Sequence, residues 1–136
     1  MPVRIKYSVK ASVSSNSDID DGDLGNLSYD VVDDQQGEGG ARKFTLEAAA
    51  VDVPIDLGNV ADAKLIFIRT NAKDPLDTPV PIELNYPLTT NDAIVVAPVG
   101  AAKEGHFLLT TDSFTALFAS NPGAIDMELT LLVVGD

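Results

Sequence analysis

Short runs of alternating apolar and polar residues recur along this chain, and they constrain its fold more than any other feature. The first run places Val3, Ile5, Tyr7, Val9, Ala11 and Val13 on one side and Arg4, Lys6, Ser8, Lys10 and Ser12 on the other. The run that closes the sequence alternates in the same way, with Ile125, Met127, Leu129, Leu131 and Val133 on one side. A period of two is typical of a half-buried β-strand, so both ends of the chain are predicted to be strands.

The stretch "KFTLEAAAVDVPIDL" holds two alternating runs whose parity differs. Phe44, Leu46 and Ala48 share one parity, and the other parity is shared by Val51, Val53, Ile55 and Leu57. A slip of one residue turns side chains to the opposite face, so a β-bulge or a strand that changes sheets is expected near Ala49 and Ala50. A helix over "TLEAAAV" is the main alternative, and Pro54 with its β-branched neighbours argues against a helix of any length.

Further strands are expected along the rest of the chain. "AKLIFIRT" is apolar enough for a strand near the centre of a sheet, and Pro81 inside "VPIELNY" restricts that segment to an edge or a strand start. "LSYDVV", "DAIVVAPV" and "HFLLTT" are shorter strand candidates, and "SFTALFAS", which could also form a short helical turn, weakly favours a strand. "SSNSDIDDGDLGN" and "DDQQGEGGARK" are predicted loops, the second being the most flexible. Asn121-Pro122-Gly123 predicts a type II turn with Gly123 at positive φ.

About eight to ten short strands separated by turn signals, without a convincing amphipathic helix, predict an all-β fold. The number fits an antiparallel β-sandwich of the jelly-roll type with about eight strands. An immunoglobulin-like sandwich is the alternative.

The length of 136 residues and the apolar fraction of 45% suit one domain with its own core. We expect residues 1–13 to be an N-terminal strand or arm and residues 14–136 to be a single sandwich domain.

Charge and composition exclude several classes of function. With a net charge of −12, the chain lacks the clustered lysines and arginines that binding to a phosphate backbone needs, so no nucleic-acid partner is expected. There is no cysteine, which excludes disulfides, zinc–thiolate sites and cysteine nucleophiles. The segment "MPVRIKYSVKASV" has no long apolar region typical of a signal peptide, and no run approaches the roughly 18 apolar residues of a membrane span. Use in the cytoplasm, without a membrane partner, is the expectation.

His106, in "KEGHFLLT", is the one histidine of the chain and therefore the first candidate for acid–base chemistry. A general base needs a nucleophile or a second acid beside it, and the local sequence supplies only Glu104. The metal-binding cupins, which have a related fold, use several histidines. A partly exposed histidine at the start of a strand is the favoured interpretation.

The loop "DIDDGD", from Asp18 to Asp23, is the best candidate for a metal site because oxygen ligands suit calcium. Counted from Asp18, however, the fifth and twelfth positions of an EF-hand loop would be Gly22 and Tyr29, which do not fit the pattern. A solvated acidic loop is the favoured interpretation, and a weak interfacial calcium site is the alternative. No catalytic residues, cofactor or required metal are predicted, because no phosphate loop or nucleophile elbow follows a strand.

Arg4, Lys6 and Lys10 are three of only nine basic residues, and they share one face of the first predicted strand. An ordinary solvated strand face is one interpretation. The other is a strip that docks on an acidic partner surface, including a second copy of this chain. An N-terminal strand can also be donated to the sheet edge of a neighbour.

Three stretches carry a resemblance to a known class of proteins. "AKLIFIRTNAKDPLDTPVPIEL", "GHFLLTT" and "NPGAIDMELTLLVVGD" look like parts of the small jelly-roll head decoration, or cement, proteins of tailed bacteriophages. The resemblance spans roughly residues 60–136, involves no catalytic motif, and leaves the first 60 residues largely uncovered.

The resemblance implies a non-enzymatic virion protein. Such proteins form homotrimers on the exterior of the capsid, where they contact the major capsid protein and brace it, after assembly in the host cytoplasm. A β-sandwich module that binds a carbohydrate or a receptor, such as a tail or fibre component, is the alternative, and an exposed aromatic cluster would favour it. An enzyme would need a deep pocket that holds His106 and two carboxylates.

Overall fold

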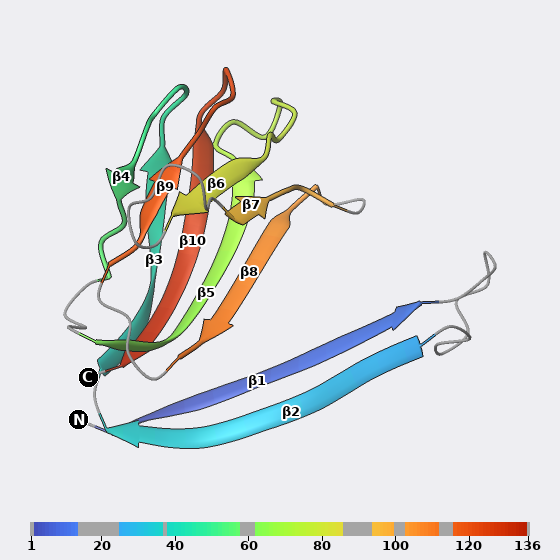
Figure 1. The fold of residues 1–136 in the computed structure, drawn as a ribbon, viewed down its shortest axis with the longest axis vertical. Coiled ribbons are helices and arrows are strands. Elements are labelled where there is room, and N and C mark those ends of the chain that lie inside the picture. The colour runs from blue at the N-terminus through green and yellow to red at the C-terminus, as the bar shows by residue number, and fades with distance from the viewer. Residues whose placement is uncertain are drawn as a thin grey trace. The chain divides into compact units, whose positions relative to one another are not determined.

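The structure is a computed structural model that describes residues 2–13, 25–36, 38–57, 62–85, 94–99, 103–111 and 116–135. These residues form ten β-strands and no helix (Figure 1). The chain divides into two compact units, Met1–Gln36 and Gly37–Asp136. The all-β class predicted from the alternating runs is therefore confirmed.

The first unit contains a long two-stranded hairpin. β1 (Pro2–Val13) pairs antiparallel with β2 (Gly25–Gln36), in an unbroken register from Pro2 opposite Gln36 to Val13 opposite Gly25. The strand predicted here is confirmed. The expected division placed a boundary after residue 13, whereas the contacts group β1 with β2 in one unit, because β2 is the pairing partner of β1.

The predicted loop over residues 33–43 is wrong. β2 continues to Gln36 and β3 (Glu38–Leu46) begins two residues later, so strands occupy all of this stretch except residue 37. The polar and glycine-rich composition suggested a loop. Backbone pairing overrides that preference, since β2 has β1 as its partner and β3 has β10 (Met127–Gly135), and ladder hydrogen bonds use main-chain groups rather than side chains.

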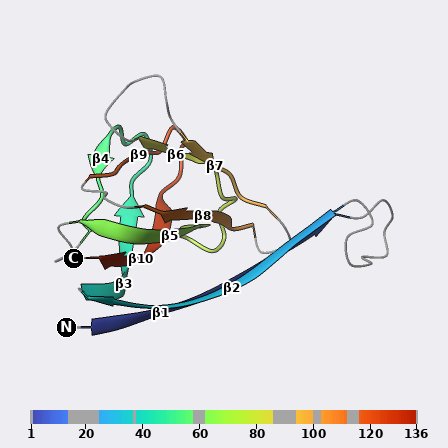
Figure 2. The same cartoon turned by 60° about the horizontal axis from the view of Figure 1, so that its bottom comes forward.

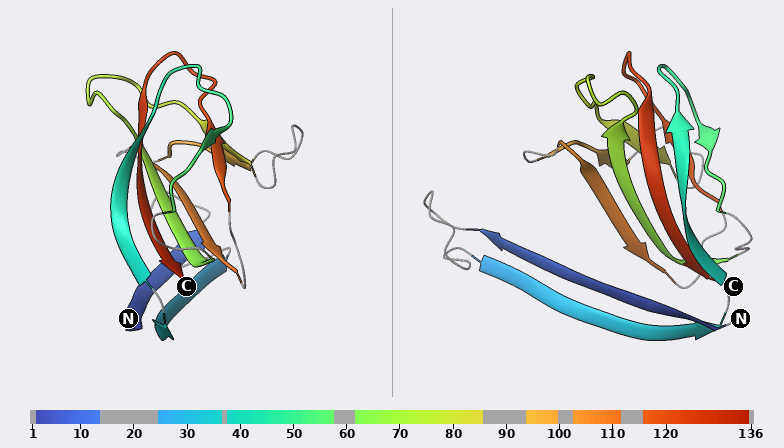
Figure 3. Two further views of the ribbon diagram at one scale, coloured as in Figure 1. Left: turned by 90° about the vertical axis from the view of Figure 1, so that its left-hand side faces the viewer. Right: turned by 180° about the vertical axis from the view of Figure 1, so that it is seen from behind.

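The second unit is a β-sandwich of two four-stranded sheets. In spatial order, the first sheet is β3-β10-β5-β8 and the second is β4-β9-β6-β7, and every neighbouring pair is antiparallel. The remaining bounds are β4 (Val53–Pro54), β5 (Ala63–Ala72), β6 (Ile82–Asn85), β7 (Ile94–Val96), β8 (Gly105–Thr110) and β9 (Phe118–Ser120). Figure 2 shows the two sheets as separate layers, and Figure 3 shows the first sheet from behind.

The order of the strands is that of a jelly roll. Along the chain, β3, β5, β8 and β10 enter the first sheet, while β4, β6, β7 and β9 enter the second. In the first sheet, β10 lies between β3 and β5, and both of these strands precede it by many residues. A jelly roll consists of two Greek keys, and this arrangement is the one that it requires. The predicted jelly-roll sandwich of about eight strands is confirmed for this unit.

The core lies between the two sheets and consists of aliphatic side chains. Leu129 and Leu131 of β10 and Ile66 and Ile68 of β5 are at most 1% exposed, and Ile82 of β6 faces them from the second sheet. The alternation of apolar residues predicted at the end of the sequence is confirmed within β10, because its buried side chains include Met127, Leu129, Leu131 and Val133. At about 1.5–3 kcal/mol for each buried large aliphatic side chain, this cluster is the main source of stability of the unit.

The connection from β3 to β4 explains the slip in parity. β3 lies in the first sheet and β4 in the second, so the chain changes sheets here. Of the two expectations, a β-bulge or a change of sheets, the second is confirmed. Ala49 and Asp52 have φ angles of 60° and 48°, in the left-handed region that turns the chain. The amide of Ala49 donates to the carbonyl oxygen of Gly123 at 3.1 Å, which ties this connection to the turn before β10.

The other strand predictions agree with the described residues. β5 lies between β10 and β8, at the interior of its sheet. β6 begins directly after Pro81, so the proline marks a strand start. Within "SFTALFAS", Phe118–Ser120 form β9, and residues 113–115 lie outside the described residues.

The turn at Asn121-Pro122-Gly123 differs from the predicted type II geometry. The φ angle of Gly123 is outside the left-handed region, so the backbone conformation does not require glycine. Space requires it instead, because a Cβ atom at this position would lie 2.6 Å from Cγ2 of Val80. Asn121 shapes the turn: its Oδ1 accepts a hydrogen bond from the amide of Gly123 at 3.0 Å, as in an Asx turn.

Candidate functional surfaces

The predicted docking strip lies on β1 of the hairpin. Arg4, Lys6 and Lys10 are all exposed there, at positions of one parity. The register places Asp30 of β2 opposite Ser8, between Lys6 and Lys10, and Asp30 is also exposed. Diagonal neighbours across an antiparallel pair are about 7–8 Å apart. The positive field of the strip is therefore partly offset by a carboxylate of the same hairpin.

The outer face of the first sheet brings together residues that the sequence did not connect. The register aligns Lys43 of β3, Thr130 of β10, Arg69 of β5 and His106 of β8 in one row across the four strands. With neighbouring strands about 4.8 Å apart, this row is about 14 Å wide. We call it the cationic row. No ion pair joins Arg69 to any residue in the described part of the chain.

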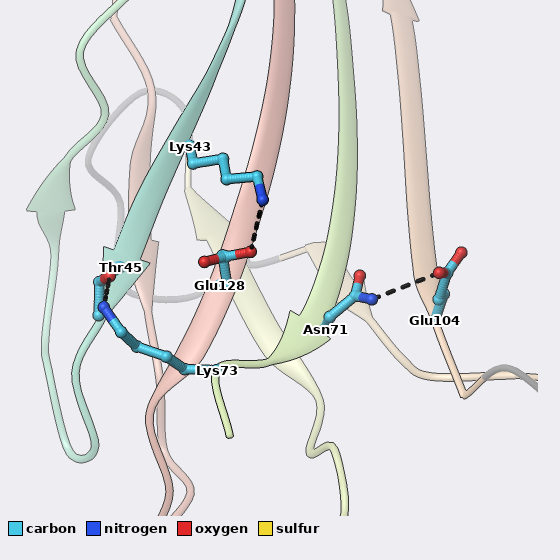
Figure 4. A network of polar contacts seen from close by, with 6 residues as sticks. All are labelled: Lys43, Thr45, Asn71, Lys73, Glu104 and Glu128. Carbon is cyan, nitrogen blue, oxygen red and sulfur yellow. Dashed lines mark hydrogen bonds and ion pairs between the residues drawn. The ribbon is translucent and has the colours of Figure 1, made fainter. Parts of the chain in front are cut away.

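Polar contacts surround the cationic row (Figure 4). The ammonium group of Lys43 lies 3.6 Å from Oε1 of Glu128, and Nδ2 of Asn71 donates to Oε1 of Glu104 at 3.3 Å. The ammonium group of Lys73 donates to the hydroxyl group of Thr45. Exposed ion pairs of this kind contribute about 0–1 kcal/mol each, so the network orients side chains more than it stabilises the sheet.

His106 lies on the exposed face of edge strand β8. Its Nε2 is 3.4 Å from Oε2 of Glu104, and the side chain of His106 is 48% exposed. Its ring packs at a tilt against Phe67, with the ring centroids 6.3 Å apart. The structure therefore places one carboxylate beside the histidine and, on the register, the guanidinium of Arg69 opposite it. A partly exposed histidine near a strand start is what the structure shows.

The acidic segment "DIDDGD" falls outside the described residues, so the structure does not bear on its calcium chemistry. Within the described ranges, no three or more histidine, aspartate or glutamate side chains are grouped closely enough to hold a metal ion.

A partly buried cluster of polar side chains joins the β3–β4 connection to the ends of β6 and β9. Oδ1 of Asp52 accepts hydrogen bonds from Nδ2 of Asn85 at 2.9 Å and from the hydroxyl group of Ser120 at 3.4 Å. The amide of Asp52 donates to the same hydroxyl group at 2.9 Å. Asn85 and Ser120 are 7% and 8% exposed. These bonds hold Asp52 at its positive φ angle, which is a structural role.

One shallow pocket of about 360 Å³ lies beside the connection between β5 and β6. Leu76, Asp77 and Lys103 are among the residues that line it. Leu76 is 92% exposed, so this side chain projects into solvent rather than closing the pocket. The lining contains no aromatic ring that could stack on a sugar.

The outer face was not predicted because its rows depend on register. Lys43, Arg69 and His106 are far apart in the sequence, and only the pairing of β3, β10, β5 and β8 aligns them. The one available signal was parity, since Arg69 and His106 are polar at outward positions of the otherwise apolar strands β5 and β8.

Comparison with models of protein families, with curated proteins and with solved structures finds no match for this chain. Among the residues that the structure describes, there is no helix of the length and apolarity needed to cross a lipid bilayer.

Proposed function

We propose that this chain is a non-enzymatic structural protein of a bacteriophage virion, which decorates the exterior of the capsid as a homotrimer and stabilises the major capsid protein. The proposal joins the resemblance of residues 60–136 to head decoration proteins with the observed jelly-roll order of β3–β10. A fold alone hosts many functions, so the role depends on what the remaining surfaces of the molecule can do.

The hairpin unit is the observation that carries the proposal. β1 and β2 have 12 residues each, which corresponds to a ribbon about 40 Å long. An isolated two-stranded hairpin is marginally stable in water, so such a ribbon needs a surface to pack on. An extended strand can add to the sheet edge of a neighbouring chain, so an element of this length suits a protein that bridges the subunits of a shell.

The main alternatives have less support. An exposed aromatic cluster would favour a carbohydrate-binding or receptor-binding module, but the large exposed apolar side chains of the described residues are aliphatic. An enzyme would need His106 in a pocket with two carboxylates, and the structure places it beside Glu104 on an exposed strand face.

Binding to capsids tests the proposal. Purified protein is added to phage shells that lack a decoration protein, and co-sedimentation and electron microscopy measure occupancy. We expect saturable binding at local three-fold axes and greater resistance of the shells to heat. Light scattering of the free protein is expected to give about three times 14.3 kDa. The virion role would be contradicted if the protein bound none of the tailed-phage shells to which their own decoration proteins bind.

A further inference from the structure

The connection between β5 and β6, residues 73–81, carries the most exposed large apolar side chain of the described residues. Leu76 is 92% exposed, and residues 73–78 are all exposed around it. Its acidic neighbours, Asp74 and Asp77, form no ion pair in the described part of the chain. Figure 1 shows this connection at one end of the sandwich, beyond the end of β5. It therefore presents an apolar side chain flanked by two carboxylates.

Hydrogen bonds hold this connection in one conformation. The amide of Asp77 donates to the carbonyl oxygen of Asp74 at 3.0 Å, which closes a turn. Oδ1 of Asp74 accepts from the amide of Leu76 at 3.0 Å. The amide of Lys73 donates to the carbonyl oxygen of Asp126 at 3.0 Å, which ties the connection to the turn before β10. A backbone that is already ordered loses little conformational freedom when it binds a partner.

The outer face of the first sheet has the complementary character. In the cationic row, Lys43 and His106 each have a carboxylate beside them, whereas no residue in the described ranges forms an ion pair with Arg69, which is exposed. Phe67 lies two residues before Arg69 on the same face of β5, and the register places Leu132 of β10 beside it. Leu132 is 41% exposed and Phe67 is half-buried. Arginine and aromatic side chains are enriched at protein interfaces.

We propose that the β5–β6 connection of one copy docks on the outer face of the β3-β10-β5-β8 sheet of a second copy. Leu76 contacts Phe67 and Leu132 there, and Asp77 pairs with Arg69. The contact joins two different surfaces head to tail. Such contacts close into a ring, as in a trimer, when the rotation between subunits allows it.

The geometry of the two surfaces favours a second copy as the partner. Because Leu76 is 92% exposed, its own sheet does not accept it. Phe67 lies five residues before the end of β5 at Ala72, which is about 17 Å along the strand. The donating and receiving surfaces of one copy therefore do not overlap, so each copy can use both at once. Opposite charges, Asp77 and Arg69, fix the orientation of such a contact.

Replacing the apolar anchor tests the contact. Analytical ultracentrifugation over a range of concentrations measures the dissociation constant of the oligomer. Leu76→Ser is expected to raise this constant about tenfold or more, as the loss of an interface anchor does, and to shift the mass towards 14.3 kDa. The fold should persist, since residue 76 is almost fully exposed. Val95→Ser, at a position of β7 that is 59% exposed and outside both surfaces, is the matched control and should leave the constant unchanged.

Charge reversal tests the proposed pair. Asp77→Arg and Arg69→Glu should each weaken assembly, because each brings like charges together. The double variant restores opposite charges and should assemble better than either single variant. The turn is preserved in Asp77→Arg, since Asp77 contributes its amide to the hydrogen bond with Asp74. Urea denaturation establishes that each variant is folded, and Arg69→Gln, which adds no carboxylate to the sheet, replaces Arg69→Glu if that variant does not fold.

Three results would overturn the contact. The first is a parent protein that stays at 14.3 kDa at every concentration measured. The second is an equal effect of Leu76→Ser and Val95→Ser on the dissociation constant. The third is a folded double variant that assembles no better than both single variants, since another element would then occupy the face around Arg69.

The contact rests on the proposed function only in requiring more than one copy, and the two can fail separately. Assembly that depends on Leu76 and on the Asp77–Arg69 pair, without binding to phage shells, would remove the capsid role and keep the contact. Binding to shells by a parent protein that is monomeric in solution, with the same occupancy for Leu76→Ser, would remove the contact and keep the capsid role.

Discussion

Asn121 shows how one buried amide can hold several connections together. Its side chain is fully buried, and its Nδ2 donates to the carbonyl oxygens of Leu46 at 3.2 Å and Ile125 at 2.7 Å. Its own amide donates to the carbonyl oxygen of Ala50 at 2.8 Å. The residue therefore joins the end of β3, the connection to β4 and the turn before β10, and no apolar residue could replace these bonds.

Asn121→Ala is expected to lower the free energy of unfolding by about 2–3 kcal/mol, because two buried carbonyl groups lose a donor. Urea denaturation followed by circular dichroism measures the change. Asn71→Ala is the control, since this amide is partly exposed and makes a single bond of 3.3 Å to Glu104. Its cost is expected to stay below about 1 kcal/mol. Equal costs for the two variants would contradict the role given to Asn121.

Gly123 is expected to be required for space rather than for conformation. Gly123→Ala should cost about 1–3 kcal/mol, because the added methyl group would lie 2.6 Å from Cγ2 of Val80. Val80→Ala removes that obstacle, so in a double-mutant cycle the second substitution should recover much of the loss. Additive costs would show that the backbone at residue 123, and not the contact with Val80, demands glycine.

At the scale of single elements, the regular strands were predictable and the polar ones were not. β1, β5 and β10 follow from alternation or apolar runs, because side-chain burial dictates their patterns. β2 and β3 extend through "DDQQGEGGARK", where the sequence has no alternation of apolar residues and the strands follow from backbone pairing. The cationic row could not be predicted from the sequence for the same reason, since register is set by pairing partners that are distant in the chain.

The basic strip of β1 gives a prediction at this scale. Changing Arg4, Lys6 and Lys10 together to Gln should leave the fold intact, because these exposed positions are opposite in parity to Tyr7 and Val9. Assembly, with itself or with a capsid, should weaken and become less sensitive to salt, since exposed charge pairs contribute only about 0–1 kcal/mol each and are screened. Binding to shells at low and high salt measures the effect. Unchanged binding at both salts would make the strip an ordinary solvated face.

At the scale of the whole molecule, the two units differ in how they are stabilised. The second unit contains the entire core cluster, from Leu46 to Val133. In the described part of the first unit there are two strands, and no residue of the core cluster lies in them. A two-stranded hairpin alone is only marginally stable in water, whereas the sandwich has a core of its own.

A chain that begins at Gly37 is therefore expected to fold alone. It should keep a β-rich circular dichroism spectrum and a cooperative urea transition, while a peptide of residues 1–36 should be largely unstructured. If the fragment instead unfolds without cooperativity, the hairpin contributes to the core of the sandwich. A folded peptide 1–36 would show that the hairpin needs no partner.

The position of β10 has a consequence for how the protein is made. Among the described strands, β3 pairs with β10 alone, and 80 residues, 47–126, lie between the end of β3 at Leu46 and the start of β10 at Met127. At ~5–20 residues per second, a ribosome needs about 4–16 seconds to synthesise that interval. During this delay, β3 lacks its pairing partner β10, and β5 lacks one of its two neighbouring strands. The first sheet is completed only after β10 has been translated, so nascent chains that stall before Met127 would expose unpaired strand edges to aggregation and to chaperones.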